Sequence, residues 1–144
     1  GGAGAGTGQG AVAINRIEKE GIMDISKTIA TMKEDPAFAE NVGMVLVHNG
    51  IVRAWSRGDH SPVNRVEVRV DQAKVEAIRR EVEESEGIYR VLVEARSGTL
   101  RPGDDLLFLI VAGDIRENVK PALALLLDRI KAEAIEKCES FSIE

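Results

Sequence analysis

The spacing of apolar residues along the chain predicts an alternation of helices and strands. Apolar positions that recur every three or four residues, as on one face of a helix, indicate helices over residues 23–36, 71–87 and 117–138. Alternating or short continuous apolar runs indicate strands over residues 42–55, 65–70, 89–95 and 104–113. The predicted order is therefore helix, two strands, helix, two strands, helix.

Polar residues, glycine and proline mark the ends of the predicted helices. Pro36 stops the first helix, and Asp71 and Gly87 begin and end the second. Asn118 is expected to cap the third helix, because Pro121 is tolerated only near a first turn.

This order of elements predicts an α+β domain. Short connections between successive strands favour a mixed, mostly antiparallel sheet with helices packed on it. The first ten residues hold six glycines, so we expect residues 1–22 to be a flexible Gly-rich lead. We expect residues 23–144 to form a single domain.

Composition narrows the range of functions. The net charge of -5 argues against a general nucleic-acid binder, although a local basic pocket stays possible. The single cysteine, Cys138, fits a reducing compartment, so a cytoplasmic location is expected, and no apolar run is long enough for a membrane span. His48 and His60 lack metal-ligand spacing, and no phosphate-loop or dinucleotide fingerprint is present, so no metal or cofactor is expected.

Three arginines near turns and helix ends are candidates for binding anions. Arg53 follows a predicted strand, Arg96 lies in a turn, and Arg116 lies at the start of the last helix. Guanidinium groups pair bidentately with phosphate and carboxylate, and the N-terminus of a helix attracts anions. The alternative is that all three are solvated surface arginines.

Two lysines near the end of the chain are candidates for chemistry. Lys131 and Lys137 are six residues apart, which is about 600° of rotation on a continuous helix, so they would not share a face. They could converge only if the helix ends between them. A lysine in a cationic pocket can lose its proton and act as nucleophile or base, whereas the alternative is a pair of surface lysines.

Several motifs follow one order over residues 24–139. The strand "VGMVLVHNGIVR" ends at Arg53, and "GDHSPVNRVEV" carries Glu67. The turns "RSG" and "LRPGD" come next, then Ile115-Arg116 at the end of a strand, and finally "DRIK", which ends at Lys131. In this order and spacing the chain resembles the molybdopterin synthase large (catalytic) subunit family.

The resemblance implies an α+β fold, a homodimer of large subunits, and a heterotetramer with a ubiquitin-like sulfur carrier. It implies that the carrier's C-terminal Gly-Gly, as a thiocarboxylate, delivers sulfur to the pterin substrate, cyclic pyranopterin monophosphate, to form molybdopterin. It implies catalytic roles for Lys131 and, if one residue is deleted, Lys137. Arg53, Arg116 and Arg96 would bind the anionic substrates. Arg53, Arg116, Lys131 and Lys137 are then expected to converge in one cleft, at a subunit boundary.

Several departures from the family pattern, among them two lost histidines, leave other hypotheses open. Ala95 and Ile115 stand where the family carries histidines, which removes a proton donor from the expected site. The chain could therefore be a non-catalytic dimeric homologue that binds a ubiquitin-like tail or an anionic pterin. It could also be a domain whose basic residues are scattered over the surface.

Overall fold

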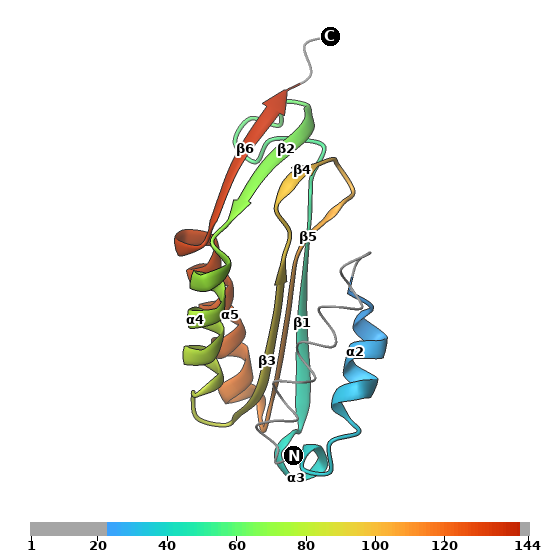
Figure 1. Ribbon diagram of the computed structural model, residues 1–144, viewed down its shortest axis with the longest axis vertical. Coiled ribbons are helices and arrows are strands. Elements are labelled where there is room, and N and C mark those ends of the chain that lie inside the picture. Colours follow the sequence, from blue (N-terminus) through green and yellow to red (C-terminus); the bar gives the residue numbers. More distant parts are fainter. Residues whose placement is uncertain (1–22, 142–144) are drawn as a thin grey trace.

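The computed structural model describes residues 23–141, so the lead expected over residues 1–22 lies outside the described residues. Ten helices and strands follow one another in this part of the chain (Figure 1). Their order is α2 (Ile25–Met32), α3 (Phe38–Asn41), β1 (Met44–Ile51), β2 (Val63–Val70), α4 (Gln72–Glu83), β3 (Ile88–Ala95), β4 (Gly98–Leu100), β5 (Asp105–Gly113), α5 (Arg116–Glu133) and β6 (Ile135–Phe141).

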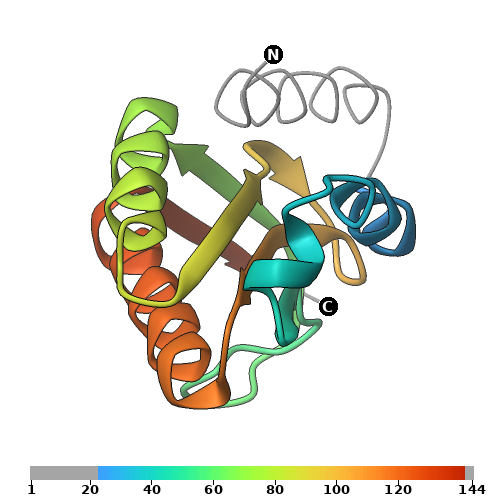
Figure 2. The same ribbon diagram turned by 90° about the horizontal axis from the view of Figure 1, so that it is seen from below.

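The strands form two three-stranded sheets, with orders β1-β5-β3 and β4-β2-β6. Each pairing between the described strands is antiparallel. Figures 1 and 2 show α4 and α5 on one face of the first sheet and α2 on the opposite face, with the second sheet beyond one end of the first. The predicted α+β class is confirmed, and its strands are divided between two sheets.

The central strand β5 is apolar on both faces because both faces of its sheet are covered. Leu109 and Val111 belong to the core cluster that includes α4 and α5, whereas Phe108 and Ile110 belong to the cluster on the α2 side. Side chains alternate across a strand, so helices on both faces require an unbroken apolar run. The predicted second helix also holds, with Asp71 as its N-cap and a buried stripe of Val75, Ile78 and Val82.

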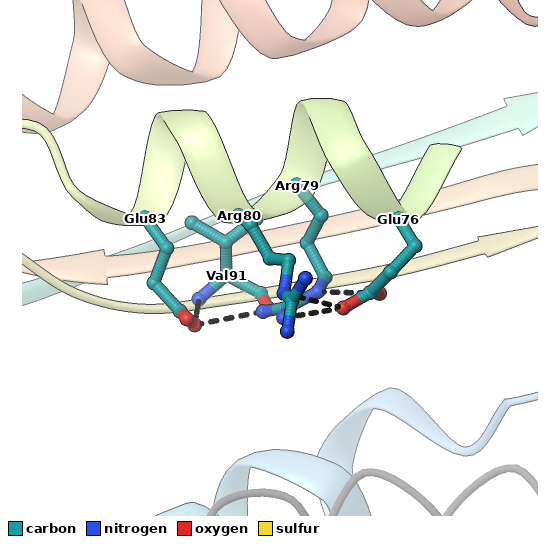
Figure 3. A network of polar contacts seen from close by, with 5 residues as sticks. All are labelled: Glu76, Arg79, Arg80, Glu83 and Val91. Carbon is teal, nitrogen blue, oxygen red and sulfur yellow. Dashed lines mark hydrogen bonds and ion pairs between the residues drawn. The ribbon is translucent and has the colours of Figure 1, made fainter. Parts of the chain in front are cut away.

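Helix α4 covers the open edge of strand β3 through a polar clamp (Figure 3). Arg79 Nη1 donates to the backbone oxygen of Val91 at 3.1 Å, and the Val91 backbone N–H donates to Glu83 Oε2 at 2.9 Å. Arg79 also pairs with Glu76 at 2.8 Å. The clamp satisfies backbone groups that an edge strand would otherwise expose for pairing with another chain.

Two predictions about the C-terminal segment were wrong. Helix α5 ends at Glu133, and the residues predicted to continue it form β6, which pairs with β2. A hydrogen bond from Asp71 N–H to Ala134 O begins this pairing, so a long-range partner outweighs the local helical pattern. The helix is capped by Ile115 instead of Asn118, whose side chain donates to Asp114 Oδ1 at 2.9 Å.

Two further features were not predicted from the sequence. Strand β4 lies within the segment predicted as a turn between β3 and β5, and it pairs with β2. The short helix α3 follows α2. In the part of the chain that the structure describes, none of the helices is both long and apolar enough to cross a membrane.

Candidate functional site

The end of α5 and the start of β6 place the two candidate lysines near each other. Helix α5 ends at Glu133, between Lys131 and Lys137, which is the condition under which the sequence allowed them to converge. In β6, Lys137 lies opposite Val68 and Glu139 lies opposite Val66, and both valines are buried. Cross-strand partners point to the same face, so Lys137 and Glu139 belong to the inner face of the second sheet.

Three positive side chains act on Lys137 here, and we call the four residues the cationic cluster: Arg53, Arg57, Lys131 and Lys137. Burial lowers the pKa of the Lys137 ammonium, although the residue keeps contact with solvent. The charges of Arg53, Lys131 and Arg57 lower this pKa further, whereas Glu139 raises it. Neighbouring like charges disfavour the protonated amine, so the cluster makes Lys137 a better nucleophile or base.

Arg53 of the cluster is held in place by three contacts, two with Trp55 and one with Glu139. Its guanidinium carbon lies 4.8 Å from the centre of the Trp55 ring, and its Nε donates to the Trp55 backbone oxygen at 3.2 Å. Arg53 Nη2 also lies 3.8 Å from Glu139 Oε2. The Trp55 ring in turn stacks on His60 with 4.5 Å between ring centroids. This arrangement restricts the guanidinium before any anion arrives.

Arg116 does not join the cationic cluster of its own chain. It begins α5, and Lys131 follows 15 residues later, which is about 22 Å along a helix. The Arg116 side chain is 76% exposed and lies 3.7 Å from Glu117. The N-terminus of α5 already has an anion, because Asp114 accepts from Asn118 Nδ2 at 2.9 Å and from Ile115 N–H at 2.6 Å. These two bonds lower the pKa of Asp114.

Arg96 lies on the other face of the first sheet. Its Nη1 donates to the Asp105 backbone oxygen at 3.3 Å. Its charge acts on Glu94, whose carboxylate accepts a hydrogen bond from Met23 N–H at the start of the α2 segment. Arg96 therefore faces the α2 side, whereas Lys131 belongs to the helix on the opposite side.

The residues of the site that the sequence did not single out lie on β1, in the loop that follows β1, and on β6. Arg57 and Trp55 share this loop with Arg53, so the proximity of Arg53 could have drawn attention to them. Glu139 is two residues after Lys137, and only the assignment of β6 as a strand reveals that both share a face. His48, on β1, is a further neighbour of Lys131, whose charge lowers the pKa of its imidazole after the larger effect of burial.

The recess next to Lys137 opens on the other face of the second sheet. It has a volume of about 450 Å³ and is lined by Glu67, Arg69, Glu136 and Cys138, which lie on the outer face, together with Lys137. No group of three or more His, Cys, Asp or Glu side chains among residues 23–141 could hold a metal ion.

The model of the MoaE protein family matches residues 19–133 of the chain. The chain belongs to the MoaE family. This confirms the resemblance stated from the sequence motifs.

Similar proteins agree with this assignment. A probable molybdopterin synthase of Haloferax volcanii is 30% identical over 95 residues, which are 63% of this chain and 36% of that protein. The chain thus spans about a third of the length of that curated relative. The structure of molybdopterin synthase from Staphylococcus aureus is 25% identical, with a TM-score of 0.62 over 72% of this chain and 77% of that one.

More distant solved structures share the fold. A MoaE protein of molybdopterin biosynthesis from Burkholderia ambifaria is 18% identical, with a TM-score of 0.62 over 85% of this chain and 86% of that one. A complex of subunits 1 and 2 of molybdopterin-converting factor from Helicobacter pylori gives a chain that is 18% identical, with a TM-score of 0.61 over 84% and 81%.

One of the two lost family histidines of this MoaE chain lies away from its own cationic cluster. Ile115 is the N-cap of α5 and is 52% exposed, at the opposite end of the helix from Lys131. The other position, Ala95, is buried at the end of β3. Ile115 therefore does not remove a contact from the cluster within one chain.

Proposed function

We propose that this MoaE chain is the catalytic subunit of a molybdopterin synthase. It would transfer sulfur from the thiocarboxylate of a ubiquitin-like carrier to cyclic pyranopterin monophosphate, leaving the carrier with an ordinary carboxylate. The convergence of Arg53, Lys131 and Lys137 in one cluster supports this proposal, since both reactants are anions. Membership of the MoaE family supports the choice of reaction.

The roles of the cations follow from their chemistry. Arg53, held by Trp55 and Glu139, would bind the phosphate or the carrier tail through its planar guanidinium. Lys131 would supply a second positive charge. Lys137, whose pKa is lowered by burial and by neighbouring cations, would act as the base for cleavage of the carrier's carbon–sulfur bond. Water would add to the acyl carbon and give its proton to the amine, and the sulfur would leave with the pterin, so that the carrier keeps an ordinary carboxylate. A lysine placed in this way favours the catalytic subunit over a homologue that only binds.

The proposed assembly is a homodimer of this chain within a heterotetramer that includes the carrier. The Helicobacter pylori structure, a complex of two subunits of molybdopterin-converting factor, supports a small-subunit partner. In such an assembly Arg116, which is exposed in one chain, would bind substrate at the site of a neighbouring copy. Arg96 would have to contribute at a subunit boundary in the same way. Cys138 is a free, exposed thiol, and this supports a cytoplasmic location for the protein, because the cytoplasm keeps thiols reduced.

Reconstitution tests this function. The chain is mixed with thiocarboxylated carrier and cyclic pyranopterin monophosphate, and the dithiolene product is measured. Lys131→Ala and Lys137→Ala should each reduce turnover by about 100-fold or more, as expected for loss of a catalytic group. Lys120→Ala, on an exposed position of α5, should retain the wild-type rate. Wild-type turnover in both cluster variants would overturn the proposed mechanism.

A swap of neighbours tests the placement of Lys137 at constant charge and composition. The double variant Lys137→Cys and Cys138→Lys moves the ammonium to the outer face of β6, because successive side chains of a strand point to opposite faces. We expect it to be as inactive as Lys137→Ala. Activity equal to that of the wild type would mean that the inner face of β6 is not the reaction site.

A further inference from the structure

His48 lies on the face of β1 that looks toward helix α5. Its cross-strand partner on β5 is Leu109, which is completely buried in the core cluster shared with α4 and α5. Met44 and Leu46, which precede it on the same face of β1, pack against that cluster too. The imidazole therefore lies in an apolar setting, in the layer between the first sheet and α5.

The Nε2 atom of this imidazole is buried and has no hydrogen-bond partner among the described residues. The strand makes room for the ring two residues further on, where a Cβ on Gly50 would lie 3.3 Å from His48 Nε2. A buried polar nitrogen without a partner destabilises a fold, so native structures usually provide one. A donor that approaches Nε2 would remove this cost.

Lys131 is the charged group that acts on this imidazole. It continues a helical row with Leu123 and Leu127, which pack against the core cluster that Met44 and Leu46 of β1 also contact, and helical side chains lean back toward the N-terminus of their helix. Helix α5 contacts β1, and Figure 1 shows it running alongside the first sheet toward the second sheet. Burial first, and then the charge of Lys131, lower the pKa of His48, which keeps the imidazole neutral and able to accept a hydrogen bond near pH 7.

We propose that His48 is a positioning residue for Lys131: in the anion-bound protein, its Nε2 accepts a hydrogen bond from the Lys131 ammonium and holds that charge in the cationic cluster. The anion offsets the repulsion among Arg53, Lys137 and Lys131, so the lysine can settle against a buried acceptor. Nδ1 then carries the proton of the neutral ring. The part that this bond plays in sulfur transfer depends on the proposed function, but the bond itself does not.

NMR spectroscopy of the imidazole tests the bond without any enzymatic assay. A long-range ¹H–¹⁵N spectrum at neutral pH, with inorganic pyrophosphate as the anion, should show His48 as the tautomer protonated on Nδ1. Lys131→Gln should move the His48 titration to higher pH, because a positive neighbour is lost. Lys120→Gln should leave it in place.

The other charges of the cluster, from Arg53, Arg57 and Lys137, and the neighbouring charge of Glu139 are the same in both lysine variants. They therefore cannot account for a difference between Lys131→Gln and Lys120→Gln. A neutral His48 protonated on Nε2, or a titration that Lys131→Gln leaves unchanged, would overturn the proposal.

Two substitutions of His48 separate the hydrogen bond from packing. His48→Phe keeps a ring without an acceptor and should weaken pyrophosphate binding about fivefold, the typical value of one net hydrogen bond. His48→Gln, with an amide oxygen near the place of Nε2, should bind within about twofold of the wild type. Equal affinity in His48→Phe and the wild type would also refute the proposal.

The outcomes distinguish this proposal from the proposed function. If the tautomer and the His48 shift are as expected but no dithiolene forms, the pairing stands and the assigned reaction is wrong. If sulfur is transferred while the imidazole does not respond to Lys131→Gln, the reaction stands and the positioning role falls.

Discussion

Glu139 carries a negative charge next to the cationic cluster, and removal of this charge should strengthen anion binding. Its carboxylate lies 3.8 Å from Arg53 Nη2, and the side chains of Arg53 and Glu139 are 32% and 23% exposed. Two unit charges at this separation interact by about 1 kcal/mol in water and by about 4 kcal/mol at an effective dielectric constant of 20. Solvent reaches both groups, so the lower figure applies, and measured pairs of this kind give about 0.2–1 kcal/mol.

This magnitude predicts that Glu139→Gln tightens pyrophosphate binding by roughly 1.4- to fivefold at low salt. The gain should shrink as salt is added, because the Debye length is about 10 Å at 0.1 M ionic strength. The pKa of Lys137 should fall further, since the Glu139 charge raises it in the wild type. Isothermal titration calorimetry measures the affinity, and selective labelling of the lysine side chains for NMR measures the titration.

Glu136→Gln is the matched control for this prediction. Glu136 is exposed on the same strand, opposite Arg69, and its side chain points to the outer face. The Glu136→Gln substitution removes one negative charge from the protein, as Glu139→Gln does, but leaves the charges next to the cationic cluster unchanged. If the two variants changed the affinity equally, or if Glu139→Gln weakened binding, the inner face of β6 would not be the anion site.

Other predictions concern stability and titration. Leu126→Ala should lower the free energy of unfolding by about 2–5 kcal/mol in chemical denaturation, because the side chain is completely buried, whereas Leu125→Ala, 49% exposed, should cost far less. Arg79→Met should cost about 1–3 kcal/mol by leaving the clamp on β3 unsatisfied. Burial and then the hydrogen bond to Asp35 raise the pKa of Tyr89 above its ordinary value of 10.0. Tyr89 is the single tyrosine, so the midpoint of its phenolate absorbance should lie above pH 10. Stability from this group is therefore present below pH 10 and lost as the pH rises further, and Asp35→Asn should lower the pKa only in part.

The parts of the fold that depend on local pattern could be predicted from the sequence. Asp71 begins α4 as expected, since its carboxylate accepts from Lys74 N–H at 3.0 Å, a bond made within four residues. The buried stripe of that helix and the apolar run of β5 were also read correctly, because burial imposes a period on the sequence. These features need no knowledge of distant partners.

The parts that depend on distant partners could not be predicted in the same way. Strand β6 alternates Lys137 and Glu139 with Glu136 and Cys138, so neither of its faces is apolar and its pattern does not identify a strand. It is a strand because β2 offers a free edge, and its register with Val68 follows from that pairing. Arg57 joins the site only because the loop after β1 folds back toward this sheet, which no spacing reveals.

The same reasoning explains why the candidate site divides into residues that one chain brings together and residues that it does not. The charge of Lys131 reaches Lys137 because α5 ends between them and because an odd-numbered position of β6 faces the core. A slip of one residue in β6 would turn Lys137 outward and replace it with an acidic or sulfur-bearing neighbour. Arg116 and Lys131 stay apart within one chain, because they lie near opposite ends of the 18-residue helix α5. A contribution of Arg116 to this chemistry therefore requires a second copy of the chain, whereas the lysines and Arg53 require only correct folding of the first.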